Sequence, residues 1–456
     1  MRFKRFFDPS LFCIQTELGK VSFLALFLPI LFESATTTVL STVNTAVISG
    51  FSNNAAAAIG ACTPIISMLL LTQTVISLGT SVIVSNSVGA KDLSAARRIS
   101  FTGALISAVC ALIITPIALI FAEQIMHFQN LDGEIFDIAV RYFRIRAIFF
   151  LCHAFSAYMT ALLRCYGYAR YTFYVGVINN LLNLAFSLLA INLPSATPAS
   201  AADIMALGCG ISNVVSLVYL FCTFKKRQIT LERPKERGML FGYVKRILNI
   251  GIPSAISSMS FTVSQIVTTA FVVMIGDYAL SAKVIYTQIL SYAYLFSYSA
   301  GSANAILIGM RYGAREYNKM TLMNRQLSRI TRAVNLLISL SIVLLRVPLL
   351  NAFSADGTVI ALALGVFLVD ILTEQGRAIS QVYEYALRAI GDVWAGLVAL
   401  VISCWVFGIA LAYLCSIPFA FGIIGCWIGL AADECFRGIF MYFRWKTVLK
   451  RLDKSN

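Results

Sequence analysis

The stretch Gly89-Ala90-Lys91-Asp92 returns 224 residues later as Gly313-Ala314-Arg315-Glu316. Three further landmarks keep this offset: Pro29 with Pro253, Leu163-Arg164 with Leu387-Arg388, and Gly167 with Gly391. A constant offset over so many residues indicates that the chain holds two copies of one long unit. In a chain this apolar, a duplicated membrane unit is typical of transporters whose halves move against each other.

The composition supports a membrane protein. The chain has 456 residues, of which 59% are hydrophobic and 12% charged, and its mean hydropathy is +0.81. A soluble domain carries roughly 25% charged residues. Apolar stretches long enough to cross a bilayer of roughly 30 Å recur along the whole length. We therefore expect an all-α, multi-pass protein of the plasma membrane, and no strand pattern of an outer-membrane barrel is evident.

Hydropathy predicts twelve transmembrane helices, six in each half. The predicted spans are 21–48, 55–88, 99–122, 137–163, 170–193, 202–224, 247–275, 281–312, 330–354, 357–387, 393–415 and 418–443. These spans divide the chain into an N-lobe with an N-terminal arm (1–224), a basic cytoplasmic linker (225–246) and a C-lobe with a basic tail (247–456). An even number of spans per half makes the two repeats parallel.

The basic residues set the predicted orientation. Most of the 36 Lys and Arg, which give a net charge of +15, fall in alternate loops and in the two tails. This pattern places both termini in the cytoplasm. It also excludes nucleic acid as a partner, because the charges belong to loops between spans.

The remaining composition indicates a protein without cofactor or catalytic centre. The eleven cysteines form no CxxC motif, and the histidines are only His127 and His153. We interpret the cysteines as small core residues and expect no metal site. A membrane enzyme would need a catalytic His or Asp pair in a sizeable loop, and the longest loop, 225–246, contains neither.

Several stretches resemble the multidrug and toxic compound extrusion (MATE) transporter family. They are Leu28-Pro29-Ile30 with Val43-Asn44-Thr45, GAKDLSAARR (89–98), Tyr142-Phe143-Arg144-Ile145-Arg146, and Leu163-Arg164-Cys165-Tyr166-Gly167-Tyr168 with its partner Leu387-Arg388-Ala389-Ile390-Gly391-Asp392. The resemblance implies a V-shaped bundle of two lobes that rock around a central cavity. It further implies export of small organic, often cationic and amphipathic compounds in exchange for H⁺ or Na⁺.

The usual coupling carboxylates of the family are replaced in this chain. Asn44 stands where the first span usually carries Asp, and Ser187 where the fifth span carries a second acid. Phe261 and Arg377 stand where another branch has Glu in span seven and Asp in span ten. Coupling through the usual residues is therefore not expected.

Span ten carries a stripe of polar residues. Its members follow the spacing of one helical face: Asp370, Glu374, Arg377, Gln381, Glu384 and Arg388. Charges in the hydrocarbon region cost at least a few kcal/mol each, so they must face a cavity or each other. Two interpretations stay open: a structural Glu374–Arg377 salt bridge, or a stripe that lines the transport cavity and binds ion or substrate through Asp370 or Glu374. We expect Arg388 to belong to the cytoplasmic loop.

Spans one and five carry the candidate residues of the N-lobe. Glu33, four residues after Pro29, is the candidate replacement for the missing Asp, and it heads a stripe that ends at Asn44. The alternative is that Glu33 lies near the external half and meets water. Asn180 and Asn183 either donate hydrogen bonds into the N-lobe cavity or bond between helices.

Other polar residues have a structural interpretation as the first choice. Asp137 and Arg141 form an i,i+4 pair, and Asp433 and Glu434 lie beside Arg437 near the end of span twelve. Two functional alternatives remain: Arg146 could attract an anionic group, and the tyrosines of span eight, Tyr286, Tyr294 and Tyr298, could contact organic cations.

The sequence is compatible with two functions. The first is an ion-coupled exporter whose partners are a small-molecule substrate and the lipid bilayer, working as a monomer. The alternative is a flippase or exporter of a lipid-linked glycan or other anionic amphiphile, and it rests on Arg377 and Arg146.

Overall fold

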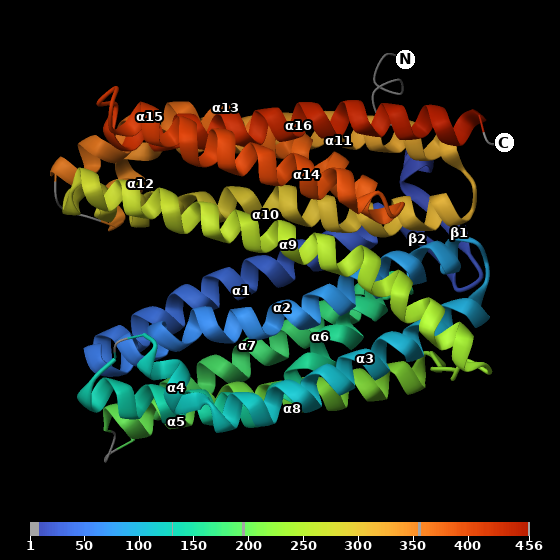
Figure 1. The fold of residues 1–456 in the computed structure, drawn as a ribbon, viewed down its shortest axis with the longest axis horizontal. Coiled ribbons are helices and arrows are strands. Elements are labelled where there is room, and N and C mark those ends of the chain that lie inside the picture. The colour runs from blue at the N-terminus through green and yellow to red at the C-terminus, as the bar shows by residue number, and fades with distance from the viewer. Residues whose placement is uncertain (1–8, 130, 194–196, 354–356, 455–456) are drawn as a thin grey trace. The chain divides into compact units, whose positions relative to one another are not determined.

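The computed structural model describes residues 9–129, 131–193, 197–353 and 357–454. These ranges are helical apart from short turns, a 3-10 turn at Pro9–Phe12, a π-helical segment and one β-hairpin (Figure 1). The internal contacts divide the chain into two units. Of the described residues, the N-terminal unit holds those within Phe32–Val88 and Asp92–Gly251, and the C-terminal unit holds those up to Leu31, Gly89–Lys91 and those from Ile252 onward.

The N-terminal unit is built mainly from seven helices, the first of which belongs to it up to Val88. They are α2 (Asn53–Gly89), α3 (Leu93–Ile120), α4 (Ala122–His127), α5 (Gly133–Ile148), α6 (Phe150–Cys165), α7 (Ala169–Asn192) and α8 (Pro198–Lys226). A buried cluster that includes Met126, Ile138 and Phe143 packs α2–α5 against α8. Helices α5 and α6 meet at an angle of 52°, which bends the predicted span 137–163.

The C-terminal unit holds most of the helices from the second half of the chain. They are α10 (Asp277–Gly313), α11 (Tyr317–Leu344), α12 (Arg346–Phe353), α13 (Gly357–Ala389), α14 (Val393–Ser403), the π-helical segment Cys404–Leu411, α15 (Ala412–Ser416) and α16 (Gly422–Lys454). Figure 1 shows α13 and α16 side by side. Tyr286 of α10 joins them, because its ring lies 4.7 Å from that of Phe367 and 4.9 Å from that of Trp427.

Two proline-containing helices contribute residues to both units. Helix α1 (Phe23–Phe51) holds Pro29, and it passes from the C-terminal unit to the N-terminal unit after Leu31. Helix α9 (Arg237–Ile275) holds Pro253, and it passes from the N-terminal unit to the C-terminal unit after Gly251. The linker was predicted as a loop, but its second half is helical, because α9 begins at Arg237.

Every stretch that hydropathy predicted as a span is mainly helical where the structure describes it. Some of these stretches form a single helix, and others form two or three consecutive helices. Within the described ranges, nine helices are each long and apolar enough to cross a membrane, and the bent pair α5–α6 would make ten. Helices α10 and α16, which lie on the predicted spans 281–312 and 418–443, are not among them. The helical membrane class is confirmed, whereas the count of twelve spans and the orientation of the termini stay predictions.

The duplicated landmarks share one backbone conformation. Lys91 and Arg315 are non-glycine residues with positive φ, at 59° and 58°. Gly167 and Gly391 also match, at 84° and 86°. Because positive φ is costly for a residue with a Cβ, its recurrence at equivalent positions supports two copies of the same local structure.

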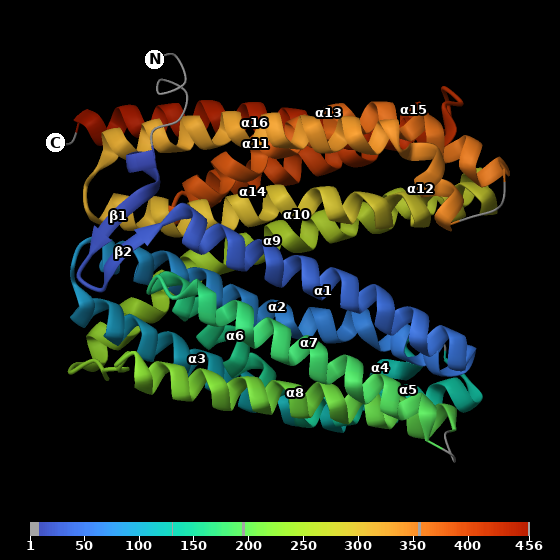
Figure 2. The same cartoon turned by 180° about the vertical axis from the view of Figure 1, so that it is seen from behind.

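A β-hairpin precedes the first helix, and the sequence pattern did not reveal it. Strand β1 (Cys13–Thr16) pairs antiparallel with β2 (Gly19–Ser22), and Figure 2 shows the hairpin ahead of α1. The side chain of Arg311 in α10 is fully buried against it and donates to the carbonyl oxygens of Leu11 at 2.8 Å and Cys13 at 2.9 Å. The hairpin is therefore attached to the C-terminal unit.

Candidate substrate and ion site

The polar stripe of α13 lies on a buried face of the C-terminal unit. Asp370, Glu374 and Arg377 are at most 8% exposed. The predicted pair between Glu374 and Arg377 is confirmed as an i,i+3 ion pair. Asn335 of α11 holds the other carboxylate oxygen of Glu374, because its Nδ2 donates to Oε2 at 3.1 Å. Glu374 is thus fixed from both sides.

Helix α16 completes the charged group with three buried residues. Arg377 Nε lies 3.4 Å from Oε1 of Glu434, and Arg437 Nη2 lies 2.6 Å from the same oxygen. Arg437 also lies 3.6 Å from Asp433. We call the six residues Asp370, Glu374, Arg377, Asp433, Glu434 and Arg437 the charge cluster. Glu434 was interpreted from sequence as structural only, and no local signal linked it to span ten.

The charge cluster contains four carboxylates but two guanidinium groups. Asp370 is the carboxylate without a guanidinium within 4.0 Å among the described residues, and the buried hydroxyl of Tyr286 lies beside it. The Oδ1 atoms of Asp370 and Asp433 are buried without a hydrogen-bond donor in this part of the chain. Buried acceptors without donors are costly, so the cluster is suited to taking up a cation.

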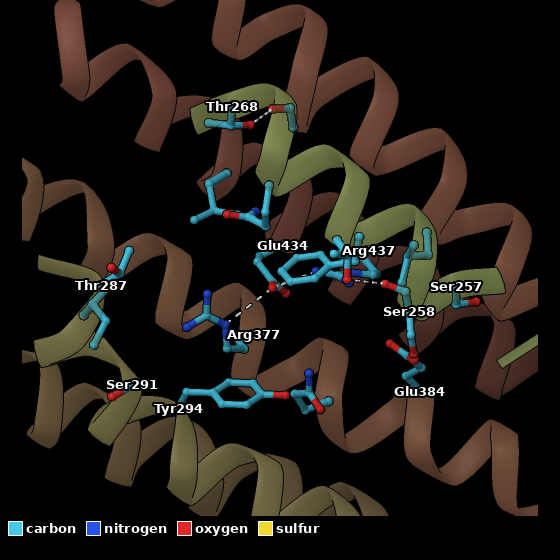
Figure 3. Close-up of a pocket in the computed structure, with 18 of the residues that line it drawn as sticks. Ser257, Ser258, Thr268, Thr287, Ser291, Tyr294, Arg377, Glu384, Glu434 and Arg437 are labelled. Carbon is cyan, nitrogen blue, oxygen red and sulfur yellow. Dashed lines mark hydrogen bonds and ion pairs between the residues drawn. The ribbon is translucent and has the colours of Figure 1, made fainter. Parts of the chain in front are cut away.

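A cavity of about 490 Å³ opens beside the charge cluster (Figure 3). Helices α9, α10, α13 and α16 and the π-helical segment line it, and its wall includes Ser258, Phe261, Thr287, Tyr294, Arg377, Gln381, Glu384, Arg388, Trp427 and Glu434. Tyr294 lies with its ring 5.5 Å from the guanidinium of Arg377. The amide oxygen of Gln381 faces this region buried and without a donor among the described residues.

The expected place of Arg388 was wrong. Arg388 lies in the last turn of α13 and lines the cavity instead of joining a loop. Its Nη2 donates to Glu384 Oε1, one helical turn earlier, at 2.6 Å, and the two side chains are 15% and 13% exposed. The i,i+4 spacing of these two residues carried the signal for this pair.

The N-terminal unit holds the second group of predicted residues. Arg164 Nη2 donates to Glu33 Oε1 at 2.6 Å, and the Thr172 hydroxyl donates to Oε2 at 3.2 Å. Arg164 belongs to the last turn of α6, which ends at the repeated Gly167 turn. Glu33 is therefore held by residues of two neighbouring helices, and its depth in the membrane stays a prediction.

The asparagines of the N-terminal unit mostly bond between helices. Asn180 Nδ2 donates to the Thr37 hydroxyl at 3.1 Å, and Asn183 Nδ2 donates to Cys209 Sγ at 2.7 Å. Asn44 differs, because its Oδ1 is buried without a donor among the described residues.

The predicted Asp137–Arg141 pair was also wrong in its partner. Arg141 forms an ion pair with Asp203 of α8, so a contact between helices prevails over the local i,i+4 spacing. Arg146 lines a small pocket together with His153 and Asn213.

Comparison with known proteins identifies the family. The MatE family model matches residues 29–189 and 253–414. The chain belongs to the MatE family of membrane transporters. The two matched segments begin at Pro29 and Pro253, the pair that keeps the offset of 224 residues, so the family model matches once in each repeat.

Individual MATE relatives match over nearly the whole chain. The uncharacterized transporter YisQ of Bacillus subtilis is 27% identical over 429 residues, covering 93% of this chain and 94% of its own. The probable multidrug resistance protein NorM of Thermotoga maritima is 23% identical over 429 residues, covering 93% and 90%. The crystal structure of a MATE protein in complex with MaL6 superposes with a TM-score of 0.88 at 18% identity, covering 95% and 96%.

This MATE protein keeps its charges at positions other than the expected ones. Phe261 and Arg377 both lie on the cavity wall, and the ring of Phe261 lies 5.9 Å from the guanidinium of Arg437. Ser187 donates to the carbonyl oxygen of Asn183, one helical turn earlier, at 2.9 Å. The charge cluster instead takes its carboxylates from Asp370, Glu374, Asp433 and Glu434.

Proposed function

We propose that this MATE protein is a secondary active antiporter of the plasma membrane. It exports small organic compounds, cationic or amphipathic in character, in exchange for H⁺ or Na⁺. It works as a monomer and needs no cofactor. The cavity of the C-terminal unit binds the substrate, and the charge cluster binds the coupling ion.

The charge imbalance of the cluster is the observation that carries this proposal. With every group ionised, four carboxylates face two guanidinium groups, which leaves two negative charges in excess inside a membrane helix pair. Excess charge in a medium of low dielectric constant is costly, so the site gains a cation by binding one or by protonation. Asp370 is the leading candidate because no guanidinium in the described part of the chain pairs with it.

The cavity wall suits an organic cation with aromatic parts. The rings of Phe261, Tyr294 and Trp427 line it together with the carboxylates of Glu384 and Glu434. Aromatic faces attract cations, and hydroxyl groups such as those of Ser258 and Thr287 add hydrogen bonds. The names of relatives such as the probable multidrug resistance protein NorM support a substrate of this kind.

The alternative of an anionic, lipid-linked substrate is not favoured. It rested on Arg377 and Arg146 as free cations, but Arg377 lies between Glu374 and Glu434 and is neutralised by both. Glu33 remains a second candidate for the coupling ion, with Asn44, Asn180 and Asn183 as the polar groups of that unit.

The test is uptake of a labelled organic cation into inside-out vesicles, with a pH gradient and a Na⁺ gradient imposed in turn. We expect one gradient to drive uptake in the wild type and about a tenfold loss of this stimulation in Asp370→Asn. Glu33→Gln is the comparison variant, because it removes the other candidate carboxylate, which already has a guanidinium partner.

The outcomes separate the candidates. If Glu33→Gln alone abolishes the gradient effect, coupling belongs to the N-terminal unit. If both variants respond to each gradient as the wild type does, carboxylate coupling by these two residues is excluded.

A further inference from the structure

Lys283 is a buried cation on the cavity wall that the proposed coupling does not use. It lies in the second turn of α10 and is 8% exposed. Its Nζ donates to the hydroxyl of Thr269 in α9 at 2.7 Å. Among the described residues no carboxylate lies within 4.0 Å of it, and its ionisable neighbour is the Cys426 thiol.

Lys283 differs in this respect from the other buried cations of the cavity. Arg377, Arg388 and Arg437 each have a carboxylate partner within the same unit. A buried ammonium is costly in a membrane protein unless an anion or several hydrogen bonds compensate it. One neutral hydroxyl is weak compensation, so the site is suited to an anionic group supplied from the cavity.

Along the two helices α10 and α16, Lys283 lies away from Glu434 of the cavity wall. Lys283 and Tyr294 are eleven residues apart on α10, which corresponds to roughly 16 Å along the helix axis. On α16, Cys426 lies beside Lys283 and Glu434 lies eight residues further on, roughly 12 Å along the axis. Both helices therefore separate an anion-binding end from the end that holds Arg377, Tyr294 and Glu434.

We infer that the cavity binds zwitterionic substrates, with the anionic group at Lys283 and the cationic group toward Glu434 and Tyr294. This inference rests on the proposed function, because it names the substrate class of that cavity. The ammonium of Lys283 pairs with a carboxylate or a similar monoanionic group, and the aromatic rings of the cavity wall contact the body of the substrate. Lys283 is then a specificity-determining residue that does not take part in ion coupling.

A matched pair of dyes provides the test. Rhodamine 110 carries a free carboxylate, and rhodamine 123 is its methyl ester, so the two differ by this one group. We would measure binding of both dyes to the purified protein by fluorescence polarisation, and their export from cells. The variants are Lys283→Met, which removes the charge, and Lys283→Arg, which keeps it. Lys319→Met, an exposed lysine outside the cavity wall, is the control for loss of any lysine.

The expected result is a selective change. Lys283→Met should weaken binding of the carboxylate dye at least tenfold and change binding of the ester less than threefold. Lys283→Arg should restore binding of the carboxylate dye, and Lys319→Met should bind both dyes as the wild type does. Retained ester binding shows in the same experiment that Lys283→Met is folded.

Other results overturn the inference in distinguishable ways. If Lys283→Met changes binding of both dyes equally, or of neither, Lys283 does not bind the anionic group. If the wild type binds the ester but not the carboxylate dye, zwitterions are not the substrate class while cation export stands. If the wild type binds the carboxylate dye through Lys283 but exports neither dye, the inference on binding holds and the proposed export fails.

Discussion

The Nε atom of Arg377 on α13 lies 3.4 Å from Oε1 of Glu434 on α16, although 57 residues separate them in the chain. The same oxygen is 2.6 Å from Arg437 Nη2, so one carboxylate serves two guanidinium groups. Glu434 is only 2% exposed. This shared carboxylate holds α13 and α16 in register at the point where the cavity opens.

Replacing Glu434 should destabilise the protein strongly. Glu434→Gln removes the charge that two buried guanidinium groups share, and breaking a buried pair in this way costs about 3–5 kcal/mol. We expect a clear fall in the apparent melting temperature of the purified protein in detergent. Transport of organic cations should fall as well, because Arg377 and Arg437 lose their common partner.

The control for this prediction is an exposed pair. Glu232 pairs with Arg97 at 2.9 Å, and the side chains are 37% and 36% exposed. Such pairs contribute at most about 1 kcal/mol. Glu232→Gln should therefore leave the melting temperature nearly unchanged, and equal effects of both variants would show that Glu434 does not bridge the helices.

The contacts along one helix could be predicted from the sequence, and contacts between helices could not. The spacing of Glu374 and Arg377 predicted their ion pair, because residues three apart share a helix face. The helical membrane class could also be predicted, because hydropathy is a property of each stretch of sequence and the repeat offset can be counted along the chain. No spacing rule relates Arg377 to Glu434, since the packing of α13 on α16 decides which faces meet.

Competition between partners limited the prediction for charged residues. Arg141 had Asp137 within one helical turn, but it pairs with Asp203 of another helix. The β-hairpin was missed for a related reason. Its strands have four residues each, which is too short for an alternating pattern, and its position depends on Arg311 some 300 residues away.

Glu33 and Arg164 should show a direct energetic coupling. Their atoms Oε1 and Nη2 are 2.6 Å apart, and both side chains are 20% exposed. Contacting residues in one network show coupling energies of about 0.5–3 kcal/mol in double-mutant cycles. We expect Glu33→Gln and Arg164→Gln each to lower the free energy of unfolding. The double variant should lose less than the sum of the two single losses. Strict additivity would show that the pair contributes no net stability.

Gly376 should be required for the packing of α13 on α16. A Cβ at this position would lie 2.7 Å from the backbone nitrogen of Cys435 and 2.8 Å from the carbonyl carbon of Glu434. Gly376→Ala therefore separates the helices beside the charge cluster, and overpacking of this kind costs about 1–3 kcal/mol. Gly60 of α2 is the matched control, since a Cβ there meets nothing within 4 Å. Gly60→Ala should keep or slightly raise the melting temperature, because Ala favours helix over Gly; a fall as large as that of Gly376→Ala would contradict the packing argument.

Arg311 should protect the N-terminal hairpin from proteolysis. Its buried guanidinium donates to the carbonyl oxygens of Leu11 and Cys13 and pairs with Glu316 at 2.5 Å. Arg311→Met removes these contacts, so the hairpin should open more often and expose Lys20 of β2 to trypsin. Intact-mass measurement should then detect a chain that begins at Val21, formed several times faster than in the wild type.

Arg315→Met, which changes an exposed arginine in the same turn, should be cleaved at the wild-type rate. If Arg311→Met is cleaved no faster than this control, contacts other than those of Arg311 hold the hairpin.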